Sequence, residues 1–314
     1  MTDYKNLKLI ATSSPHIRAA ENTRSIMLDV IIAMMPALIW AIVKFGFRAL
    51  TLTAVSVVGC MFFEWGYRKL MKKPQSVNDL SAAVTGILLA FVCPVNMPYW
   101  MILVGDFFAI VVVKQLFGGL GYNFANPAIV GRIAMALGFT GAMTSYTYPE
   151  NGIDALASAT PLAVEETAQN AGSYVTLLLG NHGGVLGETC AITLLIGGIY
   201  LIWTKVISPT IPVTYLATVA VFSLLCGYDP IYQLLSGGLM LGAIFMATDY
   251  TTSPITFKGK IIYAVGCGVL TMLIRVFGSL PEGVSFSIVI LNILVPLIER
   301  VSRPKPFGKE TVKQ

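Results

Sequence analysis

The stretch Asp154-Ala-Leu-Ala-Ser-Ala-Thr160-Pro161-Leu-Ala163 lies within the longest polar interval between the apolar runs of this chain. The interval extends from Gly141 to His182, contains four acidic residues and lacks Lys and Arg. A loop without basic residues, in a chain that has them elsewhere, is predicted to lie on the extracytoplasmic side of a membrane. Long loops in compact folds usually carry a function, so we expect a functional site in this loop.

The composition predicts an all-α polytopic membrane protein. Hydrophobic residues make up 55% of the chain and charged residues only 12%, whereas a soluble domain has about 25% charged residues. The mean hydropathy is +0.74. Ten apolar runs are long enough, or nearly so, to cross a bilayer as helices. These predicted spans are residues 26–43, 50–67, 80–95, 99–116, 127–143, 185–204, 211–226, 231–248, 260–277 and 284–300.

The basic residues predict how these spans are oriented. With a cytoplasmic N-terminus, 17 of the 21 Lys and Arg residues lie on the cytoplasmic side and three lie on the outer side. Membrane proteins show this bias, because positive loops stay in the cytoplasm. Both termini are therefore expected inside and the central loop outside. Basic residues at helix ends also account for the net charge of +5 without a nucleic-acid partner.

The central loop divides the ten spans into five plus five. An odd number of spans turns the second half over relative to the first, which gives inverted repeats like those of transporters, here an arrangement like that of urea transporters. Each half contains a polar break, at 123–127 and at 248–254. The predicted segments are a cytoplasmic segment 1–25, a first membrane half 26–143, an extracytoplasmic loop 144–184, a second half 185–300 and a cytoplasmic tail 301–314.

Residues 154–160 follow the pattern Asp-x-x-x-Ser-Ala-Thr. The Thr160 hydroxyl can be esterified by a phosphate if it lies on an exposed loop, and Pro161 disfavours helical geometry at Thr160. The alternative is an ordinary helix start, with Thr160 as N-cap and Pro161 as the first helical residue. The spacing alone leaves both interpretations open.

The same pattern resembles the recognition motif of the flavin transferase that joins FMN to Thr through a phosphoester. The chain from about residue 13 to 308 is similar to the RnfD/NqrB family. Ala155 stands where the family usually has Gly, and Tyr250 where it has Pro. The matching stretches are Ser14-Pro15-His16, Gly121-Tyr-Asn123-Phe-Ala-Asn126-Pro127-Ala128, Phe245-Met-Ala-Thr248-Asp249-Tyr-Thr-Thr-Ser253-Pro254-Ile-Thr256, Pro281-Glu282-Gly283 and Asn292.

This resemblance implies that Thr160 carries covalent FMN, with Asp154 and Ser158 as recognition residues for the transferase. It implies a second, non-covalent flavin, riboflavin, in the membrane core. It also implies a multi-pass subunit of a prokaryotic cytoplasmic-membrane complex that couples ferredoxin oxidation and NAD reduction to Na+ or H+ translocation. The implied partners are the FMN-bearing G subunit, the A and E membrane subunits, and the flavin transferase.

Asn123, Asn126 and Arg132 are candidates to contact the riboflavin. Two carboxamides three residues apart can each offer a donor and an acceptor to a flavin ring. The alternative for the asparagines is capping and turn formation before Pro127. A basic residue at the bilayer centre costs about 2.5–3.5 kcal/mol, so Arg132 is expected to meet a flavin or a carboxylate, unless it reaches the interface.

Four acidic residues are candidates for a cation path, because hard cations prefer oxygen ligands and intramembrane carboxylates are usually functional. The alternative is interfacial pairing with nearby Lys or Arg, such as Glu299 with Arg303. The candidates are Glu64, Asp249, Glu282 and Glu299.

The sequence excludes some functions and leaves two rivals. Five scattered cysteines and two histidines provide no metal or haem site within the chain, and no Gly-rich dinucleotide fingerprint follows a strand. The first rival is an NqrB-type subunit of a sodium-pumping NADH:quinone oxidoreductase. The second is a urea- or ion-permeation channel without a cofactor.

Overall fold

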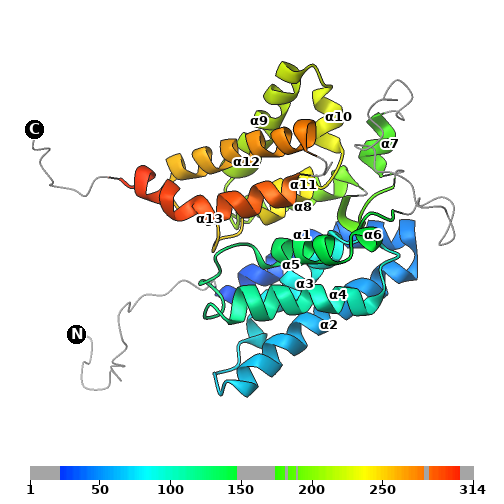
Figure 1. The fold of residues 1–314 in the computed structure, drawn as a ribbon, viewed down its shortest axis with the longest axis vertical. Helices are drawn as coiled ribbons and strands as arrows, with labels where there is room; N and C mark the ends of the chain where they lie inside the picture. The colour runs from blue at the N-terminus through cyan, green and yellow to red at the C-terminus, as the bar shows by residue number, and fades with distance from the viewer. Residues whose placement is uncertain (1–21, 147–173, 181–182, 189, 279–282, 305–314) are drawn as a thin grey trace, which may run out of the picture.

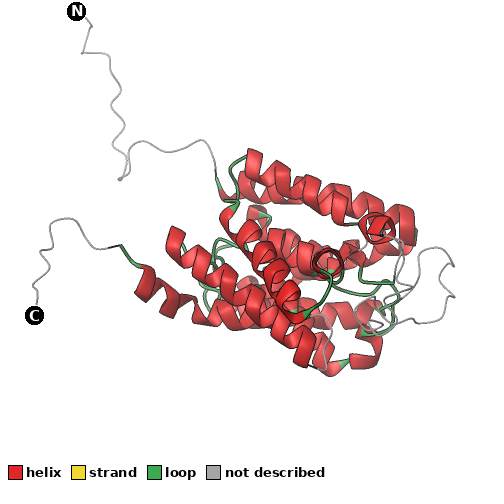
Figure 2. Ribbon diagram, turned by 90° about the horizontal axis from the view of Figure 1, so that it is seen from above, coloured by secondary structure: helices red, strands yellow, loops and turns green. Residues whose placement is uncertain are grey.

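The computed structural model describes residues 22–146, 174–180, 183–188, 190–278 and 283–304, and all regular elements of these segments are helices (Figure 2). The helices of the first half are α1 (Thr23–Phe45), α2 (Phe47–Leu70), η2 (Val77–Asp79), α3 (Ser81–Phe91), α4 (Tyr99–Phe107), η3 (Phe108–Gln115), α5 (Pro127–Gly138) and α6 (Thr140–Met143). Those after the central loop are α7 (Tyr174–Leu179), η5 (Leu186–Glu188), α8 (Ala191–Trp203), α9 (Thr210–Cys226), α10 (Pro230–Leu235), α11 (Leu239–Leu241), η6 (Gly242–Met246), α12 (Phe257–Phe277) and α13 (Val284–Ser302).

Each of the ten predicted spans coincides with helical structure, but the helices differ in length. Four of them are long and apolar enough to cross a membrane: α1, α2, α12 and α13. The remaining apolar runs form shorter helices or are built from several pieces. The run 99–116 is a continuous rod that changes from α-helix to π-helix at Phe108, and the run 231–248 consists of α10, α11 and η6.

Local sequence signals set several helix boundaries. Asn22 and Ser25 form a capping box at the start of α1. Asn126 is the N-cap of α5, with Pro127 at the first helical position, as the Asn-Pro sequence indicates. Helix α9 ends at Gly227, whose φ of 80° is the left-handed conformation typical of a glycine stop.

Figure 1 shows the two halves as one body coloured blue to green and another coloured yellow-green to red. The same pairings of helices recur in both halves. In the first half α1 packs on α3, α2 on α4, and α4 on α5; in the second α8 packs on α11, α9 on α12, and α12 on α13. The halves meet where α1 contacts α8 and where α5 contacts α13. Both contacts join helices at corresponding positions, as expected for two repeats related by a pseudo-two-fold axis.

Helices α1 and α8 approach each other closely at Gly197. A Cβ at Gly197 would lie 2.2 Å from the Ala33 carbonyl oxygen, so no larger residue fits without a backbone shift. Membrane helices associate mainly by such close packing of small residues, because lipid gives no hydrophobic drive to bring apolar helices together. This contact therefore holds the first membrane helix of each half together.

Replacing Gly197 by Ala is expected to destabilise the protein by about 1–3 kcal/mol, because the added methyl group forces α1 and α8 apart. Thermal unfolding of the detergent-solubilised protein measures the effect. Gly66→Ala is the matched control, since a Cβ at Gly66 meets no atom within 4 Å. Equal melting temperatures for the two variants would show that the α1–α8 contact does not depend on this glycine.

Candidate functional site

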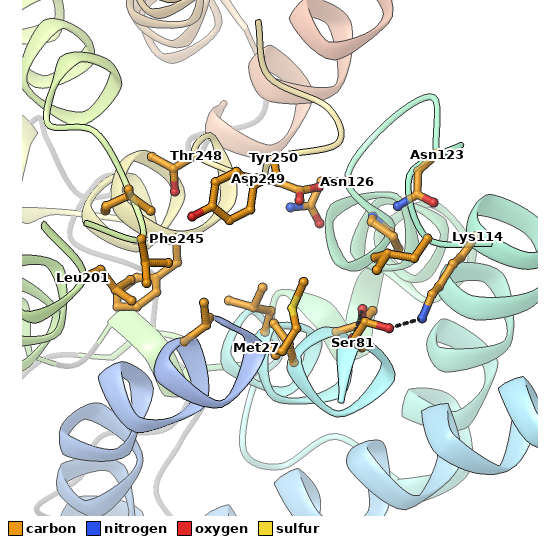
Figure 3. Close-up of a pocket in the computed structure, with 18 residues that line it drawn as sticks. Met27, Ser81, Lys114, Asn123, Asn126, Leu201, Phe245, Thr248, Asp249 and Tyr250 are labelled. Atoms are coloured by element: carbon orange, nitrogen blue, oxygen red, sulfur yellow. Dashed lines mark hydrogen bonds between the residues drawn. The ribbon is translucent and has the colours of Figure 1, made fainter. Parts of the chain in front are cut away.

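A pocket lies between the two halves (Figure 3). Its walls are mostly apolar with a few polar groups, as is typical of small-molecule sites. The lining residues come from six regions: the start of α1, one side of α3, the end of η3, the segment leading into α5, the end of α8 with the segment after it, and the stretch 245–250. Both polar breaks predicted from the sequence therefore reach the same pocket.

Asn126 is held by structural hydrogen bonds. Its Oδ1 accepts from the Ala128 N–H at 3.0 Å, and its Nδ2 donates to the Met246 carbonyl at 3.2 Å. The first bond caps α5, and the second joins the polar break before α5 to the polar break after η6. Asn126 therefore has the capping role that the sequence offered as an alternative, and one N–H of its carboxamide remains for a ligand.

Asn123 has a different environment. It lies in the segment before α5, is 9% exposed and lines the pocket. Its Oδ1 is buried and has no hydrogen-bond partner in the described part of the chain. A buried acceptor without a partner costs about 1–3 kcal/mol, so Asn123 is the side chain best suited to receive a donor from a ligand.

Asp249 and Tyr250, in the break of the second half, line the pocket beside Asn126 and across from Met27 and Ser81 (Figure 3). The Asp249 carboxylate accepts from the hydroxyls of Thr251 and Thr252 at 3.0 and 3.1 Å. Burial raises the pKa of Asp249, and the hydrogen bonds from these threonines oppose that rise. Tyr250 is 52% exposed and lines both this pocket and a second one, to which Ser208 and Lys260 also contribute.

Glu64 forms a buried ion pair at the edge of the pocket. Lys114 Nζ lies 2.8 Å from Glu64 Oε2 and donates to Ser81 Oγ at 2.6 Å. Gln115 Nε2 donates to the other Glu64 oxygen at 2.9 Å, and Arg68 Nε lies 3.8 Å from it. The Lys114 side chain is 1% exposed and that of Glu64 is fully buried. Of the paired groups, Lys114 and Ser81 line the pocket, whereas Glu64 stands behind them.

The other described candidates lie apart from the pocket lining. Arg132 is buried in α5, where Nε donates to the Val92 carbonyl at 3.1 Å and a terminal nitrogen donates to Ser285 Oγ at 2.6 Å. It links the end of α3 to the start of α13. Glu299 accepts from the Ile255 N–H at 3.1 Å, and no ion pair joins it to Arg303 in the described residues.

Four predicted site residues lie outside the described segments: Asp154, Ser158, Thr160 and Glu282. The covalent flavin at Thr160 therefore stays a prediction of the sequence.

Two residues of the pocket wall, Lys114 and Ser81, are not marked by the sequence patterns. The bias of basic residues places Lys114 at a cytoplasmic helix end, because it lies near the end of an apolar run. Its proximity to the acidic Glu64 is not visible in the sequence, since the two residues are fifty positions apart. The signal that could have marked Lys114 is a lysine inside a predicted span.

Comparison with known proteins places these features in a family. The family described as the NQR2, RnfD, RnfE family matches residues 10–308. The D subunit of the Na(+)-translocating ferredoxin:NAD(+) oxidoreductase complex of Acetobacterium woodii is 50% identical, over 98% of both chains. The D subunit of the proton-translocating complex of Clostridium ljungdahlii is 39% identical over 97% of both, and that of an ion-translocating oxidoreductase complex of Actinobacillus succinogenes is 35% identical over 95% of this chain and 97% of its own.

Breaking the Glu64–Lys114 pair is expected to be costly. Lys114→Met leaves a buried carboxylate, and Glu64→Gln leaves a buried ammonium; each is expected to destabilise the protein by about 3–5 kcal/mol. The double variant Glu64→Gln/Lys114→Met removes both charges and should recover most of this loss. Thermal unfolding of all three variants in the same detergent measures the coupling. Additive losses in the double variant would contradict a direct pairing of the two charges.

Proposed function

Because the chain belongs to the NQR2, RnfD, RnfE family, we propose that it is the flavin-bearing membrane subunit of an Rnf-type complex that couples ferredoxin oxidation and NAD reduction to cation translocation. The observation that carries this proposal is 50% identity over 98% of both chains with the D subunit of such a complex. The activity belongs to the whole complex. Partner subunits supply the ferredoxin and NAD sites. The proposed partners of this chain include the A and E membrane subunits and the FMN-bearing G subunit.

The proposal includes a non-covalent flavin, riboflavin, in the pocket between the halves. The pocket is lined by side chains of both halves, including the two polar breaks. The apolar lining suits an aromatic ring, and the buried Oδ1 of Asn123 needs a donor, which a ring N–H provides. The residues present therefore fit a flavin.

Asn123 would accept from such a ring, and Asn126 has one N–H left to donate. Lys114 and Ser81 would place a positive charge and a hydroxyl at the edge of the pocket. A bound flavin supplies one-electron redox chemistry, while the protein supplies position, exclusion of water and electrostatics. Arg132 does not line the pocket, so its part in the proposal is to join α3 to α13.

A covalent FMN on Thr160 is the second part of the proposal. It is supported by the Asp-x-x-x-Ser-Ala-Thr pattern, in which Asp154 and Ser158 would be recognised by the flavin transferase. The basic-residue bias supports an extracytoplasmic position for this loop and cytoplasmic termini. The two flavins would then be held at opposite sides of the same subunit.

The translocated cation stays open between Na+ and H+, since relatives named for each are about equally complete matches. Of the acidic candidates, Asp249 lines the pocket, whereas Glu64 is neutralised by Lys114. Asp249 is therefore the candidate best placed for a cation that enters beside the pocket. Glu299 binds a backbone N–H instead.

Thr160→Ala is expected to abolish covalent flavin in this chain, because no other atom would carry the phosphoester. The measurement is in-gel flavin fluorescence of the denatured chain, with the mass of the peptide that contains residues 154–160, after expression with the transferase. Thr167→Ala, in the same loop, is the matched control and should keep the fluorescence. A dark wild-type band with an active transferase would contradict the covalent flavin.

Asn123→Ala is expected to lose most of the non-covalent flavin while keeping the covalent flavin. Acid extraction of the purified complex followed by chromatography measures the free flavin, and the denatured gel measures the bound one. Asn78→Ala, which changes an exposed asparagine, is the matched control. Unchanged extractable flavin in Asn123→Ala would place that flavin elsewhere, and absence of both flavins from the wild type would favour a permeation protein without a cofactor.

A further inference from the structure

Asp106 is a fully buried carboxyl group near the end of α4, where α4 continues into η3, and it lies outside the pocket and its ion pair. Its Oδ1 lies within hydrogen-bond distance of Ser56 Oγ, at 2.7 Å, and of Cys60 Sγ, at 3.2 Å, both on α2. Its Oδ2 is buried and has no hydrogen-bond partner in the part of the chain that the structure describes. No sequence motif pointed to this residue.

Asp106 has no cationic partner among the described residues. The two ion pairs found there both belong to Glu64. On α2 the nearest titratable group is Cys60, and the Glu64–Lys114 pair acts on that thiol from further away. Cys93, after α3, interacts electrostatically with both Asp106 and Arg132 of α5, and α3 itself contains no titratable residue. An ionised carboxylate in this position would keep a buried charge without compensation.

The two contacts of the Ser56 hydroxyl, to Asp106 and to Gly86, cannot both use the single proton of that hydroxyl. Ser56 Oγ lies 2.7 Å from Asp106 Oδ1 and 2.9 Å from the Gly86 carbonyl. A serine hydroxyl has one proton, and the carbonyl has none. Both contacts are hydrogen bonds only if Asp106 donates to Ser56 while Ser56 donates to Gly86.

The second oxygen of Asp106, Oδ2, faces the backbone of α2 at Gly59. A Cβ at Gly59 would lie 2.6 Å from Asp106 Oδ2, so α2 approaches this oxygen with bare backbone. Leaving a neutral carbonyl-type oxygen unpaired costs less than leaving a charged one unpaired. The geometry is therefore that of a carboxylic acid rather than a carboxylate.

We propose that Asp106 is a proton-binding site inside the membrane region. The carboxyl group is protonated, and its O–H donates a hydrogen bond to Ser56 Oγ, whose own O–H donates a hydrogen bond to the Gly86 carbonyl. The ligand is a proton rather than a metal ion, because hard metal cations take about six or more oxygen ligands. Here the facing groups are one hydroxyl, one carbonyl and the Cys60 sulfur. The site does not depend on either flavin.

The test is the infrared absorption of the intact complex at neutral pH, comparing wild type with Asp106→Asn. We expect the wild type to show a carboxylic acid C=O stretching band that Asp106→Asn lacks. Asp229→Asn is the matched control, since Asp229 caps α10 at the surface and Asn also caps helices. This control variant should keep the band.

Ser56→Ala provides an independent readout if Asp106→Asn does not assemble. Removing the hydroxyl should move the band to higher frequency, because the carboxyl loses its acceptor. A band that does not move would overturn the proposed proton chain. Spectra of wild type and Asp106→Asn that do not differ in the carboxylic acid C=O region would show that Asp106 is ionised. Loss of the band on adding Na+ at constant pH would make Na+, not a proton, the occupant.

Discussion

Every backbone N–H and C=O in a bilayer must find a partner within the protein. The two broken helices of this chain have backbone groups without a partner in their own helix, so these groups need partners elsewhere. At the break before α5, the Asn126 side chain caps the helix and also donates to the Met246 carbonyl at the end of η6. One carboxamide therefore satisfies backbone groups in both halves. The pocket exists beside this bond because the breaks meet here instead of continuing as helices.

Charged groups inside the fold are neutralised in three different ways. Glu64 and Lys114 neutralise each other, with Gln115 and Ser81 taking up further hydrogen-bonding capacity. Arg132 is solvated by a carbonyl and a hydroxyl that belong to different halves. Asp106 has no cationic partner in the described part of the chain and one oxygen without a hydrogen-bond partner there, and in our proposal a bound proton keeps it neutral. The helices that carry these groups can pack closely because none retains an uncompensated charge.

Much of the fold could be predicted from the sequence, because apolar runs, Asn-Pro starts and glycine stops are local signals. The predicted spans and the capping of α5 by Asn126 are of this kind. The composition of the pocket was only partly predictable. The motifs marked Asn123 and Asp249 separately, but their convergence depends on how the halves pack. The pairing of Glu64 with Lys114 follows from the packing of α2 against η3, which no local pattern encodes.

The proposed sites lie at different positions along the helices that carry them. Helix α5 runs from Pro127, at the pocket, to Gly138 and spans roughly 18 Å, and the short helix α6 then leads to Met143, before the central loop. The rod of α4 and η3 runs between the same two levels, from Tyr99 to the Lys114 that borders the pocket. Asp106 lies near the middle of this rod, roughly 10 Å along it from Tyr99. A ligand beside Asn123 and a proton on Asp106 would thus occupy two levels of one subunit, so a defect at one level need not remove the occupant of the other.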